Sequence, residues 1–262
     1  MSPAAQRRTE GAKSLLHSWR PAQLRNVGRL VLCYSSQEDG DLRRVGQLAE
    51  QIETYDANLA PMGIRDRAAA HREGMWHKTF HCWIVSRQAG GGLLFSLRSP
   101  EMNNHPQLLD TTVAGHLLVG ESDCGGVREI REELGIEVRR EDLISLGYRV
   151  EVEDNMIGQR NREYQAVYLL ERPASLHDYR PNVHELSGLF WLRIEDGLRL
   201  FNANQPMVTI EGCRYDSKDG RAIPAEWEVT RDCFRPRIQN YYLAVCIMAE
   251  RLIEGRLPLA IS

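Results

Sequence analysis

Residues 115–136 read GHLLVGESDCGGVREIREELGI and lead from a glycine-containing turn into a short acidic helix. On an α-helix, residues three and four apart are neighbours, with roughly 5–6 Å between their Cβ atoms. Glu129 therefore lies beside both Glu132 and Glu133. Three carboxylates this close repel one another, and a hard divalent cation such as Mg²⁺ or Mn²⁺ would offset the repulsion. The apolar residues that can face a core from the same helix are Val127, Ile130 and Leu134.

The stretch resembles the Nudix box, G-x5-E-x7-R-E-U-x-E-E-x-G-U, in which U is an aliphatic residue. The matching positions are Gly115, Glu121, Arg128, Glu129, Ile130, Glu132, Glu133, Gly135 and Ile136. Six residues, 122–127, separate Glu121 from Arg128 where the common form has seven, so the loop joins the helix one residue early. A solvated acidic helix face is the alternative, but it explains neither the Gly-x5-Glu lead nor the Arg-Glu start.

This resemblance implies an α+β fold, an α/β/α sandwich in which a mixed sheet lies between helices and the box forms a loop–helix–loop. It implies Mg²⁺ (or Mn²⁺) as the cofactor, and the implied metal ligands are Glu129, Glu132 and Glu133. Glu132 would share the metal or activate water, which makes it a catalytic candidate. Arg128 would brace the box through an ion pair, with Glu121 as one partner. The residues that shape the motif are Gly115, Glu121, Arg128 and Gly135.

Residues 50–200 also resemble a Nudix subgroup related to isopentenyl diphosphate isomerases. The phrases that carry this resemblance are Tyr55-Asp56, His71 through His77 and Ala114-Gly115-His116. The isomerases have a cysteine where this chain has Ala114, and an E-x-E pair where it has Asn161 and Glu163. Without the thiol, allylic isomerisation loses a principal acid/base group, so the sequence favours hydrolysis.

Further polar residues are candidates for the site. Glu163 is a candidate metal ligand or general base, with a solvent-facing strand glutamate as the alternative, and Glu185 is a second, weaker candidate base. The subgroup resemblance suggests a secondary metal site, whereas backbone-bonded or pocket-lining imidazoles are the simpler interpretation of His71, His77 and His116. The aromatic residues that could form substrate walls are Trp76, Phe80 and Tyr164, although aromatic strand residues are usually core.

The composition is that of an ordinary globular protein, and it excludes several classes. A net charge of −3 over 262 residues argues against nucleic acid as the main partner. No apolar run approaches the ~18–20 residues of a membrane helix. The six cysteines contain no C-x-x-C pair, which favours reduced thiols in a cytoplasmic protein.

Three segments are predicted. Residues 1–49 form a basic extension that we interpret as flexible, since residues 1–31 contain six Lys or Arg and one Glu; organelle targeting is the alternative. Residues 50–200 form the Nudix domain. Residues 201–262 form a C-terminal hairpin and helix that pack on it.

Periodicity and turn signals predict the elements between these boundaries. Strands are expected over 52–56, 60–63, 79–86, 93–98, 143–153, 163–170, 186–191, 208–215 and 227–230, with a polar turn over 154–160. Helices are expected over 65–71, 194–199 and 236–254. Pro236 opens the last of these, and Ile238 belongs to its apolar stripe, which serves the core or a homodimer contact.

The sequence therefore predicts a Mg²⁺-dependent hydrolase that cleaves a diphosphate bond in a nucleoside diphosphate-X or another organic diphosphate. Its partner would be that small molecule, without nucleic acid or a membrane. A non-catalytic diphosphate-binding module is the first alternative, and an isopentenyl diphosphate isomerase-like enzyme is the second. The intact acidic cluster argues against the former, and Ala114 against the latter.

Overall fold

The computed structural model describes residues 50–156 and 159–261. The chain divides into two units, Met1–Val45 and Gly46–Ser262, and the described residues all belong to the second. The predicted basic extension lies outside the described residues. Within those residues, no helix combines the length and apolar character that crossing a membrane requires.

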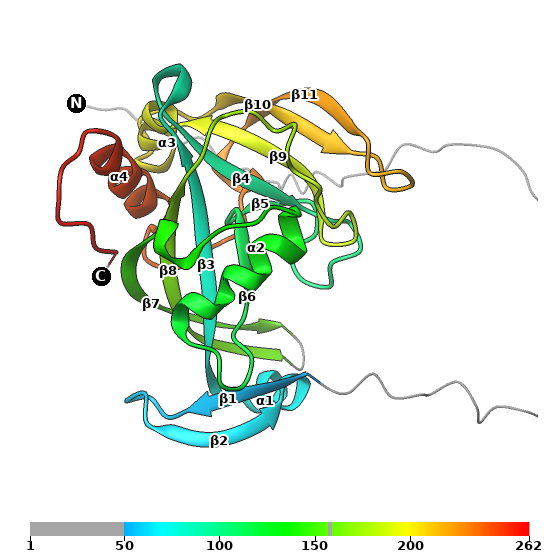
Figure 1. The fold of residues 1–262 in the computed structure, drawn as a ribbon, viewed down its shortest axis with the longest axis vertical. Helices are drawn as coiled ribbons and strands as arrows, with labels where there is room; N and C mark the ends of the chain where they lie inside the picture. The colour runs from blue at the N-terminus through cyan, green and yellow to red at the C-terminus, as the bar shows by residue number, and fades with distance from the viewer. Residues whose placement is uncertain (1–49, 157–158, 262) are drawn as a thin grey trace, which may run out of the picture. The chain divides into compact units, whose positions relative to one another are not determined.

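One mixed sheet organises the described chain (Figure 1). Its strands run in the order β11-β10-β9-β4-β3-β1-β2, while β5 pairs with β4, β6 and β8 pair with β3, and β7 pairs with β8. The parallel pairing of β3 with β8 makes the sheet mixed. The strands are β1 (Gln51–Tyr55), β2 (Pro61–Asp66), β3 (Trp76–Ser86), β4 (Gly92–Arg98), β5 (Leu109–Asp110), β6 (Val113–His116), β7 (Leu143–Met156), β8 (Gln159–Glu171), β9 (Leu186–Arg193), β10 (Val208–Tyr215) and β11 (Ala222–Val229). The α-helices are α1 (Arg67–Glu73), α2 (Val127–Leu134), α3 (Ile194–Phe201) and α4 (Tyr241–Ile253).

Helices cover both faces of this sheet, as the sequence predicted (Figure 1). Successive strand residues point to opposite faces. Phe80 of β3 packs in a cluster with Ile130 and Leu134 of α2. Trp83, three residues later, packs in a second cluster with residues of α3 and α4, among them Tyr241. The predicted α+β sandwich is confirmed.

The sheet divides along β3, and this division positions the site. β3 pairs with β4 only through Val85–Leu93 and Ser86–Gly92. Nearer the N-terminal end of β3, β6 replaces β4 as the antiparallel neighbour, and the paired residues run from Thr79–His116 to Cys82–Val113. β6 is therefore held beside β3 while β4 continues with β9 and β5.

A 3₁₀ turn, η2 (Asp123–Gly126), leads directly into α2 and forms the shortened join in the box. A Cβ atom on Gly126 would lie 2.2 Å from Cγ of Phe80, so this turn needs glycine to approach β3. Gly135 adopts the left-handed conformation, φ 67°, and ends the helix by donating its N–H to Arg131 O. The predicted loop–helix–loop is present.

The predicted start of the last helix is wrong. Gln239 and Asn240 have φ values of 62° and 48°, and two successive left-handed residues cannot continue an α-helix. The helix therefore begins at Tyr241 instead of Pro236. Ile238 precedes it, and the backbone carbonyl of Ile238 accepts a hydrogen bond from Arg149 Nη2 at 3.2 Å.

Other predicted boundaries shift by a few residues. β7 and β8 extend through most of the expected polar turn, and β11 begins at Ala222 instead of residue 227. α1 begins at Arg67 because Asp66 caps it, accepting a hydrogen bond from Ala69 N at 2.9 Å. β10 and β11 extend the same sheet as β9.

A buried charge network ties the segment before α4 to β5. Asp110 accepts hydrogen bonds from Arg237 at 2.5 Å, Arg235 at 3.3 Å and Arg98 at 3.4 Å. Burial alone would raise the pKa of Asp110, but the three guanidinium groups hold it below its usual range. Removing one partner of such a buried network leaves an uncompensated charge, so the network constrains where residues 235–237 can lie.

We predict that Gly126→Ala destabilises the fold by about 3 kcal/mol, because the added methyl overlaps the buried Phe80 ring. Gly120→Ala is the matched control: its Cβ meets no atom within 4 Å, and its φ of 79° adds only the strain of a left-handed residue, about 1 kcal/mol. Urea unfolding measures both. Equal losses in the two variants would contradict the close packing of η2 on β3.

Candidate active site

A cleft of about 900 Å³ lies where the sheet divides. Its walls come from α1, β3, β6, α2 and β8, together with the loops around Glu101 and Glu185. The predicted site residues that line it are His71, Gly115, His116, Arg128, Glu129, Glu132, Glu133, Glu163 and Glu185. The structure therefore brings together residues that are more than 110 positions apart in the sequence.

The predicted aromatic walls are not among the residues that line this cleft. Phe80 is fully buried under α2. Trp76 and Tyr164 stack on each other with ring centroids 4.7 Å apart. The Tyr164 hydroxyl donates to the carbonyl of Ala57 at 2.8 Å, so this pair holds the loop after β1.

Two carboxylates of α2, Glu129 and Glu133, are the most strongly perturbed acids of the box. Burial raises the pKa of Glu133 well above its ordinary value, and the charges of Glu129 and Glu185 add to the effect. Burial also raises the pKa of Glu129 to about 7, although Arg128 opposes the shift. The two acids lie in an environment that disfavours negative charge unless a cation is present.

Glu132 has a different environment. Its side chain is 47% exposed, and its carboxylate bonds to Arg128 Nη1 at 2.6 Å. Arg128 also donates from Nε to Glu121 at 3.1 Å and from Nη2 to Glu129 at 2.9 Å. The predicted Arg128–Glu121 ion pair is thus present despite the shortened join, and one guanidinium orients three carboxylates.

The backbone of β6 approaches these acids closely. Ala114 N–H donates to Oε1 of Glu133 at 3.4 Å. At Gly115, a Cβ atom would lie 2.1 Å from Cδ of Glu129. Because any side chain at residue 115 would displace that carboxylate, glycine is required for Glu129 to adopt this position.

Glu185 lies near the acids of α2, although it is 52 positions after Glu133 in the sequence. It precedes β9, and Oε1 accepts a hydrogen bond from Asn182 Nδ2 at 2.8 Å. Burial raises the pKa of Glu185, and the charge of Glu132 adds to the shift. A carboxylate with a raised pKa beside candidate metal ligands is suited to accept a proton.

Glu163 is held as an anion instead. It accepts hydrogen bonds from Gln165 Nε2 at 2.5 Å, Asn161 Nδ2 at 2.6 Å and Thr79 Oγ1 at 3.4 Å. Three donated hydrogen bonds favour the ionised form of this buried carboxylate. This environment favours the ligand interpretation of Glu163 over the general-base one.

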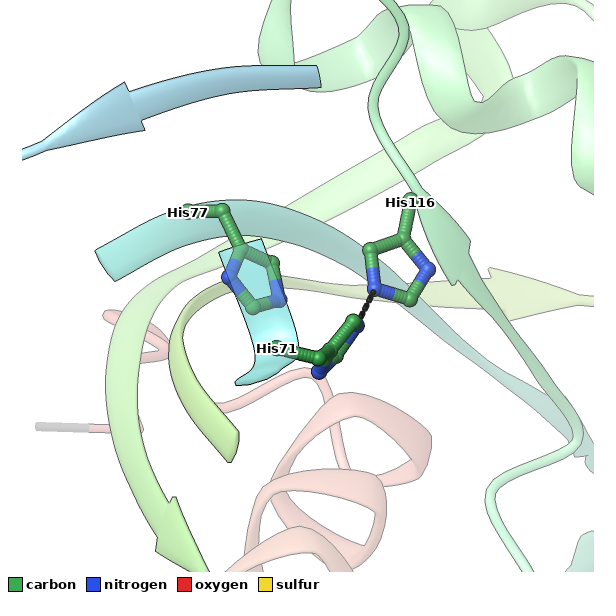
Figure 2. A group of neighbouring side chains, drawn as sticks. All are labelled: His71, His77 and His116. Carbon is green, nitrogen blue, oxygen red and sulfur yellow. Dashed lines mark hydrogen bonds between the residues drawn. The ribbon is translucent and has the colours of Figure 1, made fainter. Parts of the chain in front are cut away.

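Three histidines form a compact group (Figure 2). One of them, His77, is paired with Glu163 across β3 and β8. One ring nitrogen from each of His71, His77 and His116 lies within 4.8 Å of the others. Nε2 of His71 is 3.0 Å from Nε2 of His116. In the part of the chain that the structure describes, this is the one group of three or more His, Cys, Asp or Glu residues that close together.

The histidine group has the properties of a metal-ligand set. His77 donates from Nδ1 to the carbonyl of Met75 at 2.9 Å, which leaves a lone pair on Nε2. That Nε2 is buried without a hydrogen-bond partner, and so is Oδ1 of Asn161. Burial lowers the pKa of His71 to about 4 and lowers those of His77 and His116, so all three rings are neutral and can bind a cation.

Sequence reasoning missed His81, Arg98 and Arg235, which also line the cleft. Alternation along β3 could have indicated His81, because residues 77, 79 and 81 share one face of the strand. The arginines had no such signal. They reach the cleft through contacts with Asp110 and Glu153 that the sequence does not reveal.

The chain is similar in part to several known proteins. No family model matches the chain. Isopentenyl-diphosphate Delta-isomerase of Escherichia coli is 31% identical over 107 residues, 40% of this chain and 58% of that enzyme. The crystal structure of a Nudix hydrolase from Alicyclobacillus acidocaldarius covers 71% of this chain and 97% of its own, with 14% identity and a TM-score of 0.41.

A relative that matches three quarters of the chain identifies the family. An uncharacterized Nudix hydrolase of Clostridium acetobutylicum is 32% identical over 198 residues, 75% of this chain and 95% of that protein. The box residues that line the cleft are Gly115, Arg128, Glu129, Glu132 and Glu133, and Glu121 bonds to Arg128. The chain belongs to the Nudix hydrolase superfamily.

Proposed function

We propose that this protein hydrolyses a phosphoanhydride bond in a small organic diphosphate, with Mg²⁺ or Mn²⁺ bound by Glu129 and Glu133. The observation that carries the proposal is the cleft wall formed by the buried Glu133 and the partly buried Glu129, whose pKa values are raised by burial and by neighbouring carboxylates. Oxygen ligands of this kind fit a hard divalent cation. The cation would stabilise both ionised carboxylates.

Neighbouring residues orient these ligands and would accept a proton. Arg128 orients Glu129 and Glu132, and the backbone N–H of Ala114 orients Glu133. A bound cation would neutralise phosphate charge and lower the pKa of its water. Glu132, which shares the cation or contacts its water, and Glu185 are the proposed proton acceptors.

A second cation site is proposed at His71, His77 and His116, with Glu163 as the anionic ligand. Neutral imidazoles suit transition metals such as Zn²⁺, Co²⁺ or Mn²⁺ better than Mg²⁺. The unsatisfied Nε2 of His77 supports the proposal, because a buried lone pair without a partner is costly. In the proposed hydrolase, Glu163 would therefore act as a ligand.

Isomerisation has weaker support. The side chain of Ala114 on β6 has no proton to donate, whereas the isomerases carry a thiol at this position. Asn161 donates to Glu163 in place of the second carboxylate of the E-x-E pair. Cytoplasmic location and a homodimer remain predictions from the sequence.

Cleavage of candidate substrates tests the function directly. Nucleoside, sugar-nucleotide, coenzyme and prenyl diphosphates are incubated with the protein and Mg²⁺ or Mn²⁺, and the products are separated by chromatography. Hydrolysis should give two phosphomonoesters, or one phosphomonoester and inorganic phosphate where the terminal phosphate is unsubstituted. We expect cleavage of at least one class, and none when EDTA removes the metal. Metal-dependent binding without cleavage would favour the binding module. Allylic rearrangement of a prenyl diphosphate without cleavage would favour the isomerase.

Glu133→Gln should lower metal-dependent turnover on the order of 100-fold, since disturbing even a residue that only orients a ligand costs roughly 10–100-fold. Without metal, the fold should remain intact, because the neutral amide replaces a buried acid. The rise in melting temperature on adding Mg²⁺ should disappear. Glu137→Gln, on an exposed glutamate four residues later, is the control and should behave as wild type. Full Mg²⁺-dependent activity in Glu133→Gln would contradict the assignment.

His77→Ala should abolish binding of one equivalent of Co²⁺, because it removes the buried nitrogen that lacks a partner. The visible absorption of Co²⁺ bound to nitrogen ligands measures this without any assay of activity. His177→Ala, at an exposed histidine outside the group, should leave the spectrum unchanged. An unaltered spectrum in His77→Ala would rule out the histidine site.

A further inference from the structure

The wall of the cleft is polar along almost its whole surface. Pockets that bind organic ligands are usually lined by apolar and aromatic side chains. Here the apolar side chains are those of Ala68, Met102, Ala114 and Leu118, and no Phe, Tyr or Trp lines the cleft in the part of the chain that the structure describes. Apart from Gly115, the other described residues that line it are charged or polar. The organic group of a substrate therefore meets a hydrophilic surface.

One loop connects the α2 side of the cleft to strand β7. It comprises residues 99–108, between β4 and β5. At its start, the N–H of Ser99 donates to the carbonyl of Glu185 at 2.8 Å, and Glu185 lies near the acids of α2. Near its end, Nε2 of His105 is 2.5 Å from Oε1 of Glu153 on β7. The loop residues that line the cleft lie between these two anchors and are Glu101, Met102, Asn103 and Asn104.

Arg98 holds this loop in one conformation. Its Nη2 donates to the carbonyl of Asn104 at 2.8 Å, and its Nε donates to the carbonyl of His105 at 3.2 Å. His105 has a φ of 49°, a left-handed conformation that is costly without such support. The loop is thus organised before a ligand binds, which lowers the entropic cost of binding.

Asn103 can offer hydrogen bonds to a ligand in the cleft. Its side chain is exposed and makes no hydrogen bond with residues 50–156 and 159–261. Glu101, by contrast, bonds to Nδ1 of His184 at 3.0 Å. An amide has two N–H donors and an acceptor oxygen, so it can both donate to a hydroxyl group and accept from one.

An apolar group would gain little from this cleft. Apolar burial is favourable when the group moves from water into an apolar environment, which the wall does not provide. Arg235 and Glu153 bond to each other at 2.7 Å and remain 12% and 13% exposed. A prenyl chain against them would remove their remaining water without replacing its hydrogen bonds, which costs free energy.

A nucleobase would also lack its usual contact. Bases bind by stacking on aromatic side chains, and the predicted aromatic walls do not line the cleft. A sugar or polyol differs from both groups, because its hydroxyls can replace water on asparagine, glutamate and arginine side chains.

We propose that the organic group of the diphosphate is hydroxylated, as in a sugar or polyol diphosphate, and that Asn103 hydrogen-bonds to its hydroxyls. That the ligand is a diphosphate rests on the proposed function. Asn103 is then a specificity-determining residue, and Arg98 is a positioning residue that holds the loop. The cleft selects its substrate through hydrogen bonds instead of apolar burial.

Three analogues with a common head group test this preference. Each has a methylenediphosphonate, whose P–C–P bridge cannot be hydrolysed, esterified to the 5-hydroxyl of ribose, to isopentenol or to the 5′-hydroxyl of adenosine. Ribose and isopentenol both have five carbons and differ chiefly in hydroxylation. With Mg²⁺, calorimetry should show the ribose analogue bound at least about tenfold more tightly than the isopentenyl analogue, because only ribose offers hydrogen bonds. The adenosine analogue should bind within about threefold of the ribose analogue, since no aromatic residue receives the base.

Asn103→Ala tests the loop. It should weaken binding of the ribose analogue about fivefold and leave the isopentenyl analogue unchanged, because the amide contacts hydroxyls alone. The melting temperature should not change, since the side chain is exposed. Asn204→Ala, at an exposed asparagine outside the cleft, is the matched control and should bind both analogues as wild type does. An equal change for both analogues, or no change for either, would overturn the role of Asn103.

The outcomes separate this inference from the proposed function. Equal or tighter binding of the isopentenyl analogue, or a gain of more than tenfold from adenine, would overturn the hydroxylated substrate even if wild type cleaves diphosphates. The expected order of affinities without cleavage of any diphosphate class would overturn the hydrolase and support the preference of the cleft. Failure to bind any of the three analogues would overturn the preference, and failure to cleave any class as well would overturn both.

Discussion

The close approach of β6 to α2 is the constraint on which the cleft depends. At Gly115 there is no room for a side chain, because a Cβ atom would occupy the position of the Glu129 carboxylate. One residue earlier, the backbone N–H of Ala114 reaches Glu133. The strand therefore brings two acids into a buried wall where they repel each other, and a bound cation is the simplest way to offset that repulsion.

The C-terminal residues contribute to this cleft as well as to the core. The Asp110 network fixes residues 235–237, and the two left-handed residues that follow place the start of α4 behind β3. Tyr241, the first residue of α4, then contacts His81, which lines the cleft. Truncating the chain near residue 200 would thus remove a contact that orients a cleft residue, in addition to part of the core.

The periodicity of the sequence was sufficient to predict the helix that carries the box acids and most of the strands. Helical spacing placed Glu129, Glu132 and Glu133 together, and alternation located most strands, because both periodicities are properties of the backbone. The start of α4 was mispredicted because Pro236 is a permissive first residue, whereas the left-handed conformations of Gln239 and Asn240 depend on the tertiary fold. Glu185 joins the site through loop packing, and Arg98 and Arg235 join it through contacts with Asp110 and Glu153, which no spacing in the sequence encodes. The family resemblance indicated His71, His77 and His116 as a candidate metal site. The structure supports this site because Nε2 of His77 is buried without a hydrogen-bond partner.

The most direct test of the central claim is the affinity for Mn²⁺, measured by electron paramagnetic resonance of the free ion, with and without Gly115→Ala. Both proteins carry His77→Ala, so that the histidine site does not contribute. The account predicts that Gly115→Ala weakens Mn²⁺ binding about tenfold or more, while the free energy of unfolding changes by less than about 1 kcal/mol, because the methyl displaces a carboxylate and not the core. Unchanged Mn²⁺ affinity in a folded Gly115→Ala protein would contradict the claim that Glu129, positioned by β6, holds the cation.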